Sequence, residues 1–200
     1  MRIGLYGGCF NPVHEGHIAV ARGAQKALQL DQVIFIPSGH PPLKGNYGLA
    51  DGFHRAAMLE RAISNQPGMS VSNIELDRDG PSFTVDTVRT LRKTFQADTE
   101  VFFLLGDDCI KRLPHWKGIE ELHQLLRFAI LPRLEIMLDI HDKNMIFINI
   151  PRVAVSSTQI RETLASGKRP PAALLHPDVA EYIDRHHLFT KHPERARVQN

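Results

Sequence analysis

The pattern of apolar and polar positions divides the N-terminal part of the chain into a strand, a helix and a second strand. Arg2 to Tyr6 is short and mostly apolar, which predicts a strand. Glu15 to Gln29 instead places its apolar residues at helical spacing. Val33 to Ile36 is a continuous apolar run, typical of a parallel strand that is buried on both faces. These three elements predict a strand–helix–strand unit with a right-handed crossover.

The same two patterns continue toward the C-terminus, with strands and helices following one another. Val101–Leu105 is the most apolar run and is expected to be a central strand. This order predicts an α/β fold, a doubly wound parallel sheet with helices on both faces. Further strands are predicted over Met69–Leu76, Arg127–Leu131 and Met145–Ile150. Further helices are predicted over Asp51–Asn65 with Asp51 as the N-cap, from Ser82–Thr87 through Phe95 with Ser82 or Thr84 as the cap, over Glu120–Leu126, from Ser156–Thr158 to about Ala165 with one of these three residues as the cap, and over Asp178–His187.

Composition adds few constraints to this picture. A length of 200 residues favours one domain, expected over residues 1–190, with residues 191–200 as a polar, frayed tail. The net charge of +2 gives no reason to expect a nucleic-acid or membrane surface. No apolar run approaches the roughly 20 residues that span a bilayer. With only Cys9 and Cys109 and no secretion signal, we expect a reduced, cytoplasmic protein.

The turn after the first strand carries the first candidate chemistry. Gly7 and Gly8 let the backbone approach a ligand, and the helix that follows offers unpaired N–H groups to an anion. His14 and His17 are three residues apart, so both imidazoles can face the same anion. Gly16 keeps the surface between them low. The alternative is a plain turn with two unrelated histidines.

Two loops at the carboxyl ends of predicted strands are further candidates, because ligands of α/β sheets bind at that edge. The proline-rich segment 37–44 offers His40 as a donor and Lys44 as a cation, unless it is only a rigid connection. Gly106 and Asp108 follow the central strand. An acid there suits a ribose hydroxyl or a metal-bound water, or it caps a helix.

The start of the helix near residue 157 is a third candidate. Ser156, Ser157 and Thr158 place three hydroxyls beside free N–H groups, with Arg161 one turn further on. Capping needs only one hydroxyl. Three hydroxyls together therefore favour an anion cradle.

Two strings resemble the signatures of the nucleotidylyltransferase superfamily. Residues 7–17 resemble G-G-T-F-D-P-x-H-x-G-H, with Cys9 and Asn11 in place of Thr and Asp, and residues 155–161 resemble I-S-S-T-x-I-R. The resemblance implies a Rossmann-like sheet of the nucleotidylyltransferase type, with His14 and His17 as catalytic residues. It implies that ATP contacts Gly7, Gly8, Cys9, Phe10, Gly106, Asp108, Ser156, Ser157, Thr158 and Arg161.

Further strings resemble the bacterial nicotinate-nucleotide adenylyltransferases. Residues 37–44 resemble P-x-x-x-P-P-H-K with Leu43 in place of His, residues 82–87 resemble S-Y-T-x-D-T, and residues 113–116 match L-P-x-W. The resemblance implies adenylyl transfer from ATP to nicotinate mononucleotide in NAD biosynthesis, with Mg²⁺. It places Trp116 against the pyridine ring, although a lone Trp can also fill a core. It implies substrate contacts from His40, Lys44, Thr84, Trp116, Lys117 and Arg133.

The proposed reaction needs no general base, because the attacking phosphate is already an anion. We expect catalysis by positioning and charge stabilisation, with the two histidines on the ATP phosphates. Mg²⁺ would bridge phosphates with few protein ligands, and H-x-x-H lacks the third ligand of a zinc site. Two alternatives stay open: an enzyme for nicotinamide mononucleotide, or a non-catalytic nucleotide sensor. Partners beyond ATP and the mononucleotide are not expected, except that a homo-oligomer is left open.

Overall fold

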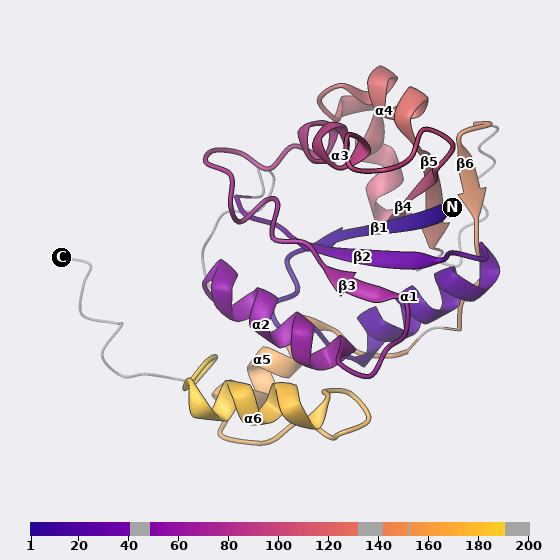
Figure 1. The fold of residues 1–200 in the computed structure, drawn as a ribbon. Coiled ribbons are helices and arrows are strands. Elements are labelled where there is room, and N and C mark those ends of the chain that lie inside the picture. The colour runs from indigo at the N-terminus through magenta and orange to yellow at the C-terminus, as the bar shows by residue number, and fades with distance from the viewer. Residues whose placement is uncertain (41–48, 132–141, 152, 191–200) are drawn as a thin grey trace.

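The computed structural model describes residues 1–40, 49–131, 142–151 and 153–190. Within these residues six strands form one sheet in the order β3-β2-β1-β4-β5-β6, and every neighbouring pair is parallel (Figure 1). Strand order reverses between β1 and β4, which creates the crevice where α/β sheets bind ligands. The strands are β1 (Arg2–Gly8), β2 (Gln32–Pro37), β3 (Met69–Val71), β4 (Glu100–Gly106), β5 (Arg127–Leu131) and β6 (Met145–Phe147).

Helices cover both faces of the sheet, so the predicted doubly wound fold is confirmed. In Figure 1, α3 and α4 lie on one side of the sheet, and α1, α2, α5 and α6 lie on the other. The helices are α1 (Glu15–Ala27), α2 (Gly52–Ile63), α3 (Thr84–Arg92), α4 (Ile119–Leu125), α5 (Ser157–Ala165) and α6 (Pro177–Arg185), with a 3₁₀ helix η1 (Asp107–His115) after β4.

Side chains of each central strand enter two separate cores. Val33 and Phe35 of β2 belong to the core under α1, α2 and α6, whereas Ile34 and Ile36 belong to the core under α3 and α4. This alternation follows from the two-residue period of a strand. It confirms that the apolar run of β2 is buried on both faces.

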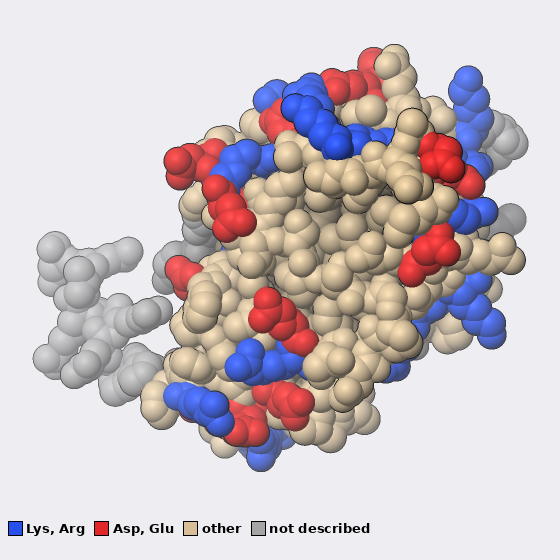
Figure 2. Space-filling view, in the orientation of Figure 1, with Lys and Arg blue, Asp and Glu red and all other residues tan. Residues whose placement is uncertain are grey.

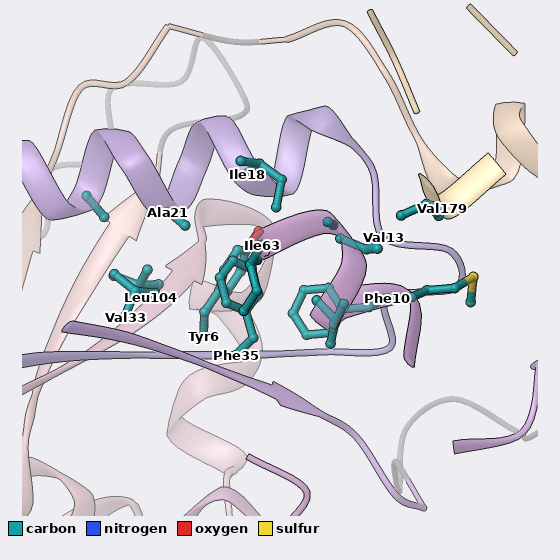
Figure 3. Close-up of a cluster of buried hydrophobic side chains, with 14 of the residues drawn as sticks. Tyr6, Phe10, Val13, Ile18, Ala21, Val33, Phe35, Ile63, Leu104 and Val179 are labelled. Carbon is teal, nitrogen blue, oxygen red and sulfur yellow. The ribbon is translucent and has the colours of Figure 1, made fainter. Parts of the chain in front are cut away.

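An aromatic cluster lies in the first of these cores, beneath the turn that follows β1. The Tyr6 ring centroid is 5.5 Å from those of Phe10 and Phe35, and the Phe10 and Phe35 centroids are 5.7 Å apart. Figure 3 shows these rings together, below Ile18 of α1. Because Phe10 belongs to the turn, the cluster anchors the turn to the core.

Several predicted boundaries differ in the structure. The strand predicted over Met69–Leu76 ends at Val71, because the Leu76 and Asp77 N–H groups turn back to the Asn73 carbonyl at 2.8 and 2.9 Å. β6 likewise ends at Phe147 instead of Ile150, as suits an edge strand paired on one side. The other helices and strands lie within a few residues of their predicted ranges.

The predicted helix caps are correct for α2 and α5 and wrong for α3. Asp51 caps α2, since its carboxylate accepts the Phe53 N–H at 2.8 Å, and Ser156 caps α5 as predicted. The prediction that Ser82 or Thr84 caps α3 is wrong, because Phe83 holds the cap position without a side-chain bond. The Ser82 hydroxyl is used elsewhere, as described below. No helix in the described residues is long and apolar enough to span a membrane.

Where α6 packs on α2, a histidine is sensitive to pH. The His186 ring lies 4.3 Å from the Tyr182 ring and 5.1 Å from the His54 ring. Desolvation lowers the pKa of His186 below its usual value, and the nearby charges of His54 and Arg185 act in the same direction. Between the lowered pKa of His186 and the ordinary histidine value of about 6.5, the unfolded chain therefore binds more protons than the folded chain.

We expect acid to weaken this contact. As pH falls below about 6.5, the ordinary value for histidine, the free energy of unfolding should decrease, and the decrease should end below the lowered pKa of His186. The effect should be small, because His186 is exposed. Urea unfolding of the native protein and of His186→Gln between about pH 5 and pH 8 measures it. An unchanged pH slope in the variant would contradict the assignment to His186.

Candidate active site

The turn from β1 into α1, which we call the glycine loop (residues 7–12), is held by side chains from two distant helices. Each side chain donates to a carbonyl group of the loop. Because a trans peptide places its C=O and the next N–H on opposite sides, the bonds to Cys9 O and Pro12 O also set the direction of the Phe10 and Val13 N–H groups. The bonds run from Arg55 Nη1 to Cys9 O (3.1 Å), from Arg161 Nη1 to Asn11 O (2.7 Å) and from Ser157 Oγ to Pro12 O (2.9 Å).

The two histidines stand together at the start of α1. Their rings are stacked, with centroids 3.7 Å apart and an interplanar angle of 30°. The backbone N–H of His14 donates to Nδ1 of His17 at 3.2 Å. Since Nδ1 of His17 accepts this bond, its Nε2 carries the proton and is the atom able to donate to an anion. His14 and His17 therefore share one face of the helix, as the spacing predicts.

Gly16 is required by close packing between the His14 ring and the segment that precedes α5. A Cβ added at Gly16 would lie 3.0 Å from atoms of the His14 ring and 2.9 Å from Cγ1 of Val155. The His17 ring also packs on the Phe10 ring in a T-shaped arrangement, with the ring centroids 5.1 Å apart. A side chain at position 16 would therefore collide with His14 and Val155, and Gly16 keeps the surface low, as expected.

A cavity of about 730 Å³ opens over the carboxyl ends of β1 and β4. It is bounded by the glycine loop, the start of α1, the end of β4 and the start of α5. Apolar side chains, among them Val20, Leu104, Leu131 and Ile150, form one wall. All twelve residues expected to be catalytic or to contact ATP line it: Gly7, Gly8, Cys9, Phe10, His14, His17, Gly106, Asp108, Ser156, Ser157, Thr158 and Arg161.

At the end of β4 the two aspartates differ in environment. Asp107 is buried, whereas Asp108 is exposed and lines the cavity. Gly106 is the cap residue of η1 and makes no side-chain cap bond. Asp108 therefore lies inside the first turn of η1 and does not serve as its N-cap. It lines the cavity two residues after the end of the central strand.

The hydroxyls at the start of α5 are ordered by different bonds. Ser156 Oγ accepts the Gln159 N–H at 3.2 Å, which is the cap, and Ser157 Oγ donates to the glycine loop. Thr158 Oγ1 accepts from Arg161 Nη2 at 3.2 Å. Arg161 thus spans α5 and the glycine loop. Two residues of the predicted anion cradle, Ser157 and Arg161, therefore hold the glycine loop through its carbonyl groups.

Of the residues expected to contact the second substrate, the described ones lie outside the lining of this cavity, and three of them are near residues 82–86. The His40 N–H donates to Ser82 Oγ at 3.1 Å, and the Ser82 N–H donates to the His40 carbonyl at 2.9 Å. Lys117 Nζ lies 4.3 Å from the centroid of the Phe83 ring and 3.2 Å from a carboxylate oxygen of Asp86. His40 and Lys117 are thereby brought to the start of α3, where Thr84 is the first helical residue.

Trp116 connects this group with the glycine loop. It is half-buried, and its ring lies edge-on to Phe103 at a centroid distance of 6.0 Å. A Cβ added at Gly7 would lie 3.1 Å from the tip of the same Phe103 ring. Trp116 therefore packs on core rings and still has an exposed part. Lys44 and Arg133 lie outside the described residues.

Comparison with known proteins identifies the family. Residues 5–163 match the family model described as cytidylyltransferase-like. The probable nicotinate-nucleotide adenylyltransferase of Halalkalibacterium halodurans is 41% identical over 97% of this chain and 94% of that protein. The nicotinate-nucleotide adenylyltransferase of Bacillus subtilis is 36% identical over 94% of this chain and 98% of that protein. The chain belongs to the nicotinate-nucleotide adenylyltransferase family.

Solved structures agree on the fold. The nicotinic acid mononucleotide adenylyltransferase of Plasmodium falciparum, in complex with NaAD, matches with a TM-score of 0.77 over 94% of this chain and 97% of that chain, at 22% identity. A putative nicotinate-nucleotide adenylyltransferase of Vibrio parahaemolyticus matches with a TM-score of 0.68 over 96% of each chain, at 18% identity. The predicted Rossmann-like fold and the predicted enzyme class, a nucleotidyltransferase, are confirmed.

Sequence reasoning gave no site role to Asn11, which belongs to the glycine loop, or to Arg55, which contacts this loop. Asn11 Oδ1 accepts the Ala50 N–H at 2.9 Å, and Arg55 donates from Nε to the Ala50 carbonyl at 2.9 Å. The only signal for Arg55 is its place in a string that resembles the R-x-x-M-L of this family. Its partner Cys9 is 46 residues away, so its contacts could not be read from local pattern.

Proposed function

We propose that the chain transfers the adenylyl group of ATP to nicotinate mononucleotide, in the cytoplasm, as a step of NAD biosynthesis. A phosphate oxygen of the mononucleotide attacks the α-phosphorus of ATP, and the bond from that phosphorus to the bridging oxygen of the β-phosphate breaks. The products are nicotinate adenine dinucleotide and pyrophosphate. One observation carries the proposal: the glycine loop, the stacked histidines and the start of α5 surround one cavity.

The cavity has a chemically distinct part for each piece of ATP. The apolar wall that includes Val20 and Leu131 suits the adenine ring, and the exposed carboxylate of Asp108 suits a ribose hydroxyl. The N-terminus of α5, with Ser156 and Thr158, suits the β- and γ-phosphates. His17 Nε2 then donates to the α-phosphate, where charge develops during transfer.

The residues at this site fit a magnesium ion that arrives with the nucleotide. Among the described residues, no group of three or more His, Cys, Asp or Glu side chains is placed to hold a metal. Mg²⁺ commonly keeps several waters and binds through one or two carboxylates and substrate phosphates. Asp108 is such a carboxylate at the cavity, so it would supply either this ligand or the ribose contact described above. The ion would neutralise charge on the phosphates.

The second substrate is proposed to place its pyridine end at the start of α3. The first-turn N–H groups of α3 have no side-chain cap, so they can receive a carboxylate. Lys117 adds a positive charge beside them, and the exposed part of Trp116 offers a face for stacking. His40, Lys44, Thr84 and Arg133 complete the proposed set. N–H groups and cations favour the acid, nicotinate, over the amide.

Pyrophosphate release tests the proposal. The purified protein is supplied with ATP, Mg²⁺ and either nicotinate or nicotinamide mononucleotide. We expect kcat/KM for the acid to exceed that for the amide by about 10-fold or more, the size expected for hydrogen bonds to a charged group. A preference for nicotinamide mononucleotide would identify the sister activity instead. No release with either substrate would favour a nucleotide sensor.

A further inference from the structure

Arg55 is a buried cation directly behind the glycine loop. It lies in the first turn of α2 and is only 2% exposed. It is not among the residues that line the cavity, whereas its partner Cys9 and the neighbouring Phe10 are. Arg55 therefore contacts the loop from the side opposite the cavity.

The guanidinium of Arg55 joins two chain segments through their carbonyl groups. Nη1 donates to Cys9 O at 3.1 Å, and Nε donates to Ala50 O at 2.9 Å. Asn11 makes a second link between the same segments, since its Oδ1 accepts the Ala50 N–H at 2.9 Å. Burial lowers the pKa of Arg55, while the carboxylates of Asp51 and Glu75 oppose the shift. A buried charge is costly unless it is compensated. Here two carbonyls accept N–H groups of the guanidinium, and the charges of Asp51 and Glu75 favour its charged form.

The direction of one peptide follows from these bonds. The Cys9–Phe10 peptide is trans, since Asn11–Pro12 is the cis bond recorded in the described chain. With the Cys9 C=O directed at Arg55, the Phe10 N–H points the opposite way, away from Arg55. Phe10 has a φ of +46°, in the left-handed region that is unfavourable for a non-glycine residue. Such a conformation persists only where neighbours hold it.

We infer that Arg55 is a positioning residue, which holds the Cys9–Phe10 peptide so that the Phe10 N–H faces the nucleotide phosphates. This inference rests on the proposed function for the identity of the bound anion. It gives Arg55 a role in the reaction without contact to the substrates. It also explains why a guanidinium is needed, because one planar group must donate to two carbonyls in different directions.

A matched pair of variants tests the inference. Arg55→Met removes the donors and keeps much of the apolar stem. Arg92→Met is the control: Arg92 also joins two carbonyls, those of Leu125 (3.1 Å) and Thr99 (2.6 Å), and it does not line the cavity. Thermal unfolding, the affinity for ATP by calorimetry without a second substrate, and kcat and KM are measured for both variants below their melting temperatures.

Both variants are expected to melt at a lower temperature. Only Arg55→Met should weaken ATP binding, by about 10-fold, and lower kcat by at least that factor. Arg92→Met should keep both values within about twofold of the native protein, because distant sites act independently. Equal ATP affinity and kcat in folded Arg55→Met and native protein would overturn the inference, as would equal losses in Arg92→Met.

A second variant covers the case in which Arg55→Met does not fold. Arg55→Lys keeps the positive charge near Glu75 but has no planar fork to reach both carbonyls. It should fold and give an ATP affinity and kcat below those of the native protein. Native values in Arg55→Lys would overturn the inference. The proposed function fails separately, if the native protein binds ATP but releases no pyrophosphate with either mononucleotide.

Discussion

His17→Ala is expected to lower kcat by at least about 10²-fold while the fold stays intact. Loss of one preorganised donor to developing charge costs on the order of 10²–10³ in rate. His17 is such a donor in the proposed mechanism, because the bond from His14 N to its Nδ1 leaves the proton on Nε2. Steady-state kinetics with nicotinate mononucleotide, together with circular dichroism, measure the effect.

His17→Asn separates the two roles of this side chain. An asparagine oxygen can accept the His14 N–H, so it should restore the bond at the start of α1, whose loss costs about 1 kcal/mol. It cannot place a donor where Nε2 lies. We therefore expect His17→Asn to recover stability but not kcat. His115→Ala, at an exposed position outside the cavity lining, is the histidine control and should keep native turnover. Near-native turnover in His17→Ala would refute the assignment.

Phe35→Ala is expected to lower the free energy of unfolding by about 3–5 kcal/mol, the usual cost of truncating a buried phenylalanine. Phe35 is fully buried, and its ring contacts Tyr6 and Phe10 beneath the glycine loop. The cavity left behind should also loosen Phe10, whose ring packs on His17. We therefore expect kcat of the folded protein to fall as well. Urea unfolding and kinetics at low temperature measure the two effects.

Phe102→Ala is the matched control for this change. Phe102 is also fully buried and belongs to the same core, but it pairs with Gly4 of β1, away from the carboxyl end of the strand. The Arg2 guanidinium lies 5.0 Å from its ring centroid. It should lose similar stability and keep native kcat in the folded protein. A loss of kcat equal to that of Phe35→Ala would show that the effect does not pass through the glycine loop.

The surface adds little that distinguishes this chain. On the face shown in Figure 2, Lys and Arg alternate with Asp and Glu around an uncharged central area. One exposed ion pair is bidentate: Arg89 donates to the two carboxylate oxygens of Glu121 at 2.8 and 2.6 Å. The hydrogen bonds from Arg89 lower the pKa of Glu121. Because both side chains are exposed, we assign this pair no large share of the stability.

Features that depend on neighbouring residues were predictable from the sequence. Asp51 and Ser156 cap their helices because a cap needs only a hydroxyl or carboxylate and an N–H group two or three residues later. The burial of β2 on both faces follows from its continuous apolar run. The shared face of His14 and His17 at the start of α1 follows from their spacing, whereas the stacking of their rings was not predicted. In each case the physical cause spans only a few residues.

Tertiary structure decided which donors meet which carbonyls. Ser82 was expected to cap α3, but it pairs with His40, 42 residues away. Arg161 reaches Asn11 across 150 residues, and Arg55 reaches Cys9 across 46. Such pairs form because packing the helices on the sheet brings their donors to carbonyls that would otherwise be left unpaired, at a cost of about 1–3 kcal/mol for each buried group. By itself the sequence determined the chemistry at each element's end, and the packed sheet determined how those ends face one another.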